Sequence, residues 1–71
     1  NAKREEQKVD KLIAELYEYY LTHVDRMSNF YVQLAYQEGR ERAVTDYIAG
    51  MTDRYATATY QRLFIPHALS Y

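Results

Sequence analysis

Apolar residues recur at every third or fourth position in the first third of the chain, which is the spacing of one face of an α-helix. The residues that follow this spacing are Val9, Leu12, Ile13, Leu16, Tyr17, Tyr20 and Val24. No glycine or proline interrupts the run. The pattern therefore predicts a first helix from about Arg4 to Val24.

A polar segment, THVDRMSN, separates this helix from the next apolar pattern. Ser28 and Asn29 are candidate N-cap residues, because a short polar side chain can accept a hydrogen bond from an unpaired N–H of the first helical turn. The weaker pattern that follows predicts a short helix from Asn29 to Gln37. Gly39 is suited to the left-handed conformation that ends many helices.

A third apolar stripe predicts a helix from about Arg40 to Leu63, ending before Pro66. The residues of this stripe are Val44, Tyr47, Ile48, Met51, Tyr55 and Leu63. The predicted fold is all-α, with two long antiparallel helices and a short connecting helix in a single segment over residues 1–71. We expect two sets of side chains to pack together, Leu12, Leu16 and Tyr20 against Ile48, Met51 and Tyr55. Residues 65–71 are predicted to form a disordered tail.

The size of the chain limits the stability that it can reach alone. A domain of 71 residues buries only about 60 % of its unfolded surface. The absence of cysteine excludes disulfides and thiolate zinc sites. Hydrophobic residues make up 48 % of the chain and nine residues are tyrosines, which excludes a disordered chain. We therefore expect a helical domain that relies on a partner surface or on the rest of a longer protein.

The charge of the chain narrows the classes of partner. The formal net charge is −1, so no basic face for nucleic acid is expected. No apolar run approaches the roughly 18 residues of a membrane span. The first residues, NAKREEQKVDK, contain no apolar region typical of a signal peptide. A cytoplasmic location is the expectation.

Gly50 is the least expected residue, because a glycine inside a helix costs about 1 kcal/mol relative to alanine. Asp46, Gly50, Asp53 and Thr57 are spaced by four, three and four residues, so a continuous helix would place them on one face. We predict that this small polar face is an interface, with its carboxylates bonded to amides or arginines of a neighbouring segment. The alternative is that the aspartates are solvated and the glycine is merely tolerated.

The segment DYIAGMTDRYA, followed by TYQRLFIP, resembles the C-terminal segment of bacterial deoxyguanosine triphosphate triphosphohydrolase-like proteins of the HD-domain phosphohydrolase superfamily. The resemblance is strongest from Arg42 to Pro66 and extends more loosely through KLIAELYEYYL. It implies that this chain is the C-terminal part of a larger all-α enzyme. It also implies that the enzyme hydrolyses deoxynucleoside triphosphates to deoxynucleoside and tripolyphosphate, uses magnesium or manganese, and forms a homo-oligomer.

The metal ligands of that family are a His, a His-Asp pair and a later Asp, which suit a divalent ion that activates water. In this chain His23 precedes Val24 and His67 precedes Ala68, so no His-Asp pair is present. We therefore predict neither a metal site nor catalytic residues within the chain. By itself the chain is then not an enzyme, although its suspected parent is one.

The candidate site residues come from the stretch that is most specific to the family. We predict that they lie at an interface or next to the substrate, and they are Asp46, Gly50, Asp53 and Arg54. The guanidinium of Arg54 could bind phosphate oxygens in a fork. Arg40 and Arg42 are expected instead to be solvated or paired with nearby carboxylates.

Three readings of the function remain open at this stage. The first is a supporting piece of a triphosphohydrolase, with the rest of the parent chain or a second subunit as partner. The second is a free-standing helical module for dimerisation or interaction. The third, a helix-turn-helix DNA binder, is the weakest because the charge does not favour it.

Overall fold

The computed structural model describes the backbone of residues 2–65 and the side chains from residue 10 onward. Its elements are α1 (Ala2–Thr22), the 3₁₀ turn η1 (Val24–Arg26), α2 (Asn29–Glu38), α3 (Arg40–Ala49) and α4 (Asp53–Phe64). No strand occurs between residues 2 and 65, and the all-α class is confirmed. Apart from Ile65, the tail predicted for residues 65–71 lies outside the described residues.

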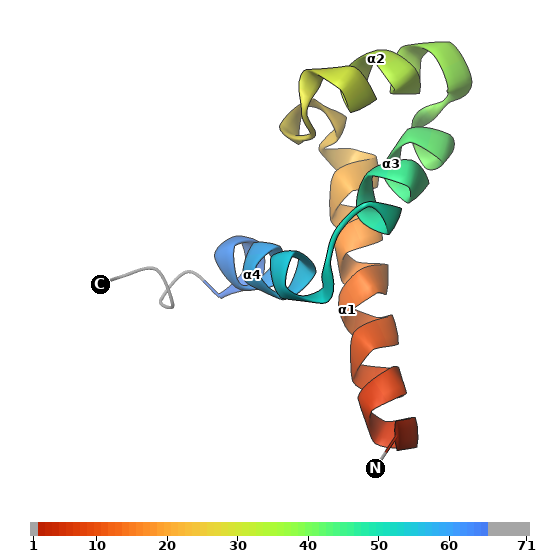
Figure 1. Ribbon diagram of the computed structural model, residues 1–71. Coiled ribbons are helices and arrows are strands. Elements are labelled where there is room, and N and C mark those ends of the chain that lie inside the picture. The colour runs from red at the N-terminus through yellow and green to blue at the C-terminus, as the bar shows by residue number, and fades with distance from the viewer. Residues whose placement is uncertain (1, 66–71) are drawn as a thin grey trace.

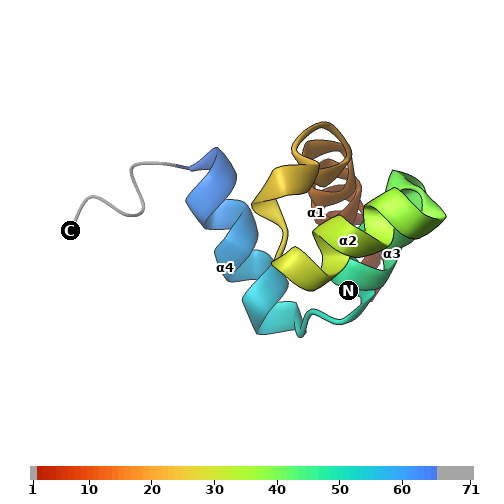
Figure 2. The same ribbon diagram turned by 90° about the horizontal axis from the view of Figure 1, so that it is seen from above.

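The helices are arranged around the C-terminal half of α1. Figure 1 shows α2 across the end of α1, α3 returning beside α1 in the opposite direction, and α4 projecting to one side. Seen from above in Figure 2, α4 and α3 lie on opposite sides of the α1 axis. The N-terminal half of α1 extends clear of the other helices (Figure 1).

The core lies where α1, α3 and the start of α4 meet. Its buried apolar residues are Leu16, Tyr20, Met27, Ala43, Val44, Ile48 and Ala56. Of the six residues expected to pack together, Leu16, Tyr20 and Ile48 are buried. Leu12 and Met51 are half-buried against this core. Tyr55 is 49 % exposed, so its assignment to the core was wrong.

The C-terminus of α1 has its last carbonyls paired by nearby side chains. Thr22 donates its hydroxyl to the carbonyl of Tyr19 over 3.0 Å. His23 Nδ1 lies 2.9 Å from the same carbonyl, and its ring stacks on that of Tyr19. Arg40, at the start of α3, donates to the carbonyl of Leu21 over 2.9 Å. These bonds satisfy carbonyls that the helix itself leaves unpaired, and Arg40 thereby ties α3 to α1.

The junction between α2 and α3 is made by Gly39 alone. The short helix α2 begins after Ser28 and ends at Glu38, within one residue of the prediction. Gly39 has φ 96° and ψ 152°, so the predicted positive φ is confirmed, although the residue is extended instead of left-handed helical. This region of backbone conformation is open almost only to glycine.

The predicted continuous helix from Arg40 to Leu63 is wrong, because the chain breaks between Ala49 and Asp53. Gly50 ends α3 with φ −82° and ψ −5°. Thr52 adopts an extended conformation, and its hydroxyl accepts a hydrogen bond from the backbone N–H of Tyr55 over 3.0 Å. A threonine that caps a new helix in this way competes successfully with continuation of the old one. The break turns α4 away from the direction of α3.

Candidate functional site

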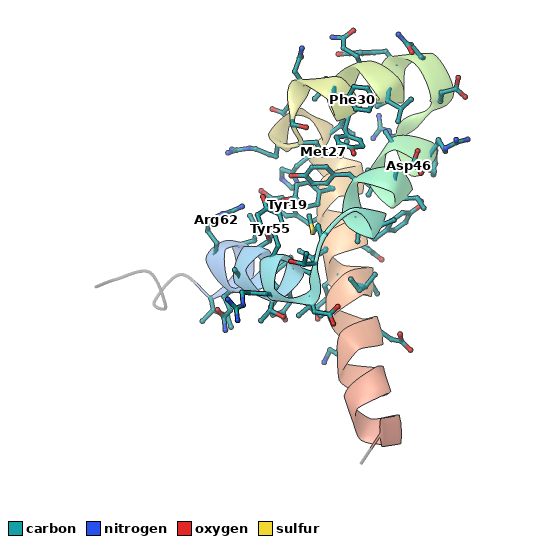
Figure 3. All side chains as sticks on the ribbon, in the orientation of Figure 1. Tyr19, Met27, Phe30, Asp46, Tyr55 and Arg62 are labelled. Carbon is teal, nitrogen blue, oxygen red and sulfur yellow. The ribbon has the colours of Figure 1, made fainter. Side chains whose placement is uncertain are left out.

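The break separates the residues that the sequence placed on one helical face. Asp46 belongs to the last part of α3, whereas Asp53 and Arg54 are exposed in the first turn of α4. The shared face of Asp46, Gly50, Asp53 and Thr57 therefore does not form, because it required an unbroken helix. In Figure 3 Asp46 lies on α3, whereas Tyr55, two residues after Asp53, lies at the start of α4.

Asp46 has its partner within its own helix. Its carboxylate accepts a hydrogen bond from Arg42 Nε at 3.0 Å, in an i,i+4 ion pair whose side chains are both substantially exposed. An exposed pair of this kind stabilises a helix only weakly, because solvent screens the charges. The Asp46 carboxylate is thus already paired, and Asp53 lies at a helix N-terminus, where negative charge is favoured.

A groove of about 400 Å³ surrounds Gly50. Its lining residues come from α2, α3, the α3–α4 junction and α4, and are Tyr31, Tyr47, Gly50, Met51, Thr52 and Tyr55. The ring of Tyr47 meets Tyr31 edge-on at 5.1 Å and Tyr20 edge-on at 5.0 Å, which is a favourable arrangement of aromatic pairs. The walls of the groove are therefore aromatic, and the ring of Tyr47 is held in place by the rings of Tyr20 and Tyr31. We call this feature the Gly50 groove.

Of the six lining residues, the sequence patterns assigned one, Gly50, to a site. Tyr47, Met51 and Tyr55 were assigned to the apolar stripe, and Thr52 and Tyr31 to neither. The sequence Thr52-Asp53 carries an N-cap signal, a hydroxyl residue followed by an acidic first turn. Tyr31 carries no local signal, because only the fold of α2 over α3 brings it to the groove.

Glycine at position 50 is not required by anything among the described residues. Its φ of −82° is open to any amino acid. A Cβ built on Gly50 would lie 3.7 Å from the carbonyl oxygens of Asp46 and Tyr47, which is ordinary van der Waals contact. Gly50 is also exposed. The lack of a side chain at Gly50 leaves the groove open at this point.

The phenols of Tyr20 and Tyr47 stay protonated at neutral pH and can donate hydrogen bonds. Burial raises the pKa of Tyr20 to about 12, and the neighbouring Tyr47 adds to the effect. Burial likewise raises the pKa of Tyr47. Neither phenol can act as a base near neutral pH. The chemistry of the groove is thus binding through aromatic surface and hydrogen-bond donation, and not proton abstraction.

The described side chains offer no cluster for the divalent metal that the family resemblance implies. Among residues 10–65, no group of three or more His, Cys, Asp or Glu side chains could hold a metal ion. His23 bonds the end of α1, and His67 lies outside the described residues.

The described helices also include none that is long and apolar enough to cross a membrane.

Comparison with known proteins shows which family this helical arrangement represents. The phosphohydrolase-associated domain matches residues 1–62, and the chain belongs to this family. The expected resemblance is confirmed by relatives called deoxyguanosinetriphosphate triphosphohydrolase-like proteins. The relative from Caldanaerobacter subterraneus subsp. tengcongensis is 49 % identical over 65 residues, covering 92 % of this chain and 19 % of the relative.

Two further relatives with the same name give a consistent picture. The Clostridium perfringens strain 13 protein is 36 % identical over 94 % of this chain and 20 % of its own length. The Geobacter sulfurreducens protein is 43 % identical over 84 % of this chain and 16 % of its own length. The chain thus spans about a fifth of the length of the curated relatives it matches. No solved structure matches the chain.

Proposed function

We propose that the chain is a supporting helical part of a deoxynucleoside triphosphate triphosphohydrolase, which splits its substrate into deoxynucleoside and intact tripolyphosphate. The observation that carries the proposal is a sequence match. Nearly the whole chain matches about a fifth of the length of relatives called deoxyguanosinetriphosphate triphosphohydrolase-like proteins. Catalysis, and binding of magnesium or manganese, belong to the rest of that longer, cytoplasmic, oligomeric protein.

In this function the Gly50 groove is the surface that another segment of the longer polypeptide, or a second subunit, crosses. Three features support this role, namely the open floor at Gly50, the aromatic walls and the exposed start of α4. Asp53 and Arg54 border the groove in sequence and remain candidates for contact with the neighbour or the substrate. Asp46, which pairs with Arg42 on the exposed surface of α3, likewise remains a candidate for contact with the neighbour.

A free-standing interaction module is the second candidate. It is favoured by α2, which has no buried residue and carries no charge from Asn29 to Gln37. Phe30 is 68 % exposed and Tyr36 is 82 % exposed on this helix. Aromatic surface without charge is typical of the centre of protein interfaces. This candidate predicts that the chain dimerises alone, through α2.

The proposal is tested by transplanting the chain into the Caldanaerobacter relative, in place of the 65 residues that match. We call the product the exchanged protein. It should release tripolyphosphate from deoxynucleoside triphosphates when magnesium or manganese is present, whereas the chain alone should release none. Metal-dependent release by the chain alone would overturn the proposal. A folded exchanged protein without activity would also count against it.

A further inference from the structure

A second groove lies between α1 and α3, and it shares no lining residue with the Gly50 groove. Its volume is about 600 Å³ and its lining is mostly apolar. The lining residues are Asp10, Ile13, Ala14, Tyr17, Glu18, Thr45, Ile48 and Ala49. This surface is separate from the Gly50 groove, and the proposed function assigns no role to it. We call it the α1–α3 groove.

One wall of the groove is a ridge on α1. Asp10, Ala14 and Glu18 are spaced by four residues, so they stand in a row along the helix. All three are exposed. The middle of the ridge is low, because alanine carries only a methyl group. A neighbouring backbone can therefore approach α1 closely at Ala14.

The opposite wall on α3 is built in the same way. Thr45 and Ala49 are also spaced by four residues, and both are small and exposed. The floor between the walls contains Ile48, which is 7 % exposed, together with the half-buried Ile13 and Tyr17. The groove thus has an apolar floor between two low, parallel helical ridges.

The described charged residues that line the groove are both acidic. Asp10 and Glu18 stand at the two ends of the α1 ridge, and their positions are eight residues apart, or about 12 Å along a helix. Among the residues with described side chains, 10–65, none of those that line the groove is basic. Among residues with described side chains, neither carboxylate takes part in an ion pair. The groove is therefore complementary to a partner with two basic groups about two helical turns apart.

The shape favours a helix over a small molecule. Five of the lining residues are exposed, so the groove is shallow, whereas pockets for small ligands enclose about 70–90 % of the ligand surface. A helix that lays an apolar stripe into a groove needs no such enclosure. The low ridges at Ala14 and Ala49 suit a helix backbone that passes between them.

The source of the partner follows from the length of the relatives. The chain covers only 19 % and 20 % of two of them, so most of such a protein lies outside the chain. We propose that the α1–α3 groove binds a helix from that remaining part, apolar on one face and bearing two lysines or arginines about two turns apart. This inference rests on the proposed function, because it takes the partner helix from the longer polypeptide.

Cysteine labelling tests the inference, since the chain has no cysteine of its own. Ala14→Cys places a thiol in the groove, and Ala58→Cys is the matched control on the exposed surface of α4. In the chain alone both thiols should react rapidly with a maleimide. In the exchanged protein the thiol at position 14 should react at least about tenfold more slowly, because docking protects it. The rate at position 58 should be unchanged.

Charge reversal adds a second readout in the exchanged protein. Asp10→Lys with Glu18→Lys should restore rapid labelling at position 14, whereas Asp25→Lys, outside the groove, should not. Equal labelling of position 14 in the chain and the exchanged protein would overturn the inference. Protection that appears in the chain alone and grows with its concentration would also overturn it, because it would identify a second copy as the partner.

A synthetic peptide tests the chemistry of the partner without the exchanged protein. The probe is a helical peptide with a leucine stripe and two lysines eight residues apart, and its control carries glutamates at those two positions. The lysine peptide should slow labelling at position 14 of the chain, and the glutamate peptide should not. Equal effects would contradict the charge argument. Tripolyphosphate release by the exchanged protein is measured separately, so loss of the groove interaction is distinguishable from failure of the proposed function.

Discussion

The junctions at the two ends of α3 each contain one of the two glycines of the chain, in different conformations. Gly39 connects α2 to α3 with a φ of 96°, which other residues adopt only with strain. Gly50 ends α3 with a φ of −82°, which any residue adopts. The first glycine is explained by its own backbone conformation, whereas the second is explained only if the proposed neighbour occupies the Gly50 groove. A glycine in a helical sequence can therefore have two different causes. One is a backbone conformation that only glycine adopts easily, and the other is a neighbouring segment that needs the space.

Between the two junctions, α3 packs into the core through Ala43, Val44 and Ile48, so loss of the core should have the largest effect. Leu16 is fully buried in the cluster that includes Val44 and Ile48. Leu16→Ala should cost about 2–5 kcal/mol and leave the chain unfolded or without fixed packing. Circular dichroism during heating measures this, with the half-buried Leu12→Ala as a milder control. A cooperative transition close to that of the wild type would show that the core is misassigned.

Alkaline pH should destabilise the side of α3 that carries the Gly50 groove. The pKa of Tyr20 is about 12 in the folded chain, against an ordinary value of 10.0. A raised pKa means that this contribution to stability is fully present below pH 10 and is lost as pH rises through about 12. Urea denaturation between these pH values should show the loss. Tyr20→Phe should flatten the profile, whereas the exposed Tyr36→Phe should leave it as in the wild type.

Gly39→Ala should destabilise the chain through its backbone alone. An ideal Cβ at this position would meet only Glu41 Oε1, at 3.9 Å, so no steric clash is involved. The strain of a positive φ should cost about 1–3 kcal/mol, which lowers the melting temperature by roughly 4–8 °C per kcal/mol in a domain of this size. An unchanged melting temperature would mean that the α2–α3 junction adopts another conformation.

Thr52→Ala tests the cap that creates the second junction. Its hydroxyl accepts the N–H of Tyr55, and loss of such a cap typically costs about 1 kcal/mol. Thr57→Ala, at an exposed position in the middle of α4, is the control and should be neutral or slightly stabilising. If the two substitutions have the same effect on urea denaturation, the hydroxyl of Thr52 does not stabilise the start of α4.

Much of the fold follows from local patterns in the sequence. The 3.6-residue periodicity located α1 and α2 to within a few residues, and Gly39 marked the first junction. The second junction was missed, because the apolar stripe from Val44 to Leu63 continues across it in sequence. At this junction the Thr52 cap competes with continuation of the helix. Which of the two is more stable depends on how α4 packs on α1. The residues of the two grooves come from different helices, so periodicity along one helix could not reveal them.

Gly50→Ala, measured both in the chain and in the exchanged protein, tests most directly whether a neighbour crosses the Gly50 groove. In the chain the substitution should stabilise by about 0.4–1 kcal/mol, because alanine restricts the unfolded state and fits the folded one. In the exchanged protein the added methyl should meet the neighbour and cost about 1–3 kcal/mol. Ala58→Gly is the control and should cost about 1 kcal/mol in both settings. If Gly50→Ala stabilises the exchanged protein as much as the chain, no segment crosses the groove, and Gly50 is a tolerated glycine at a helix end.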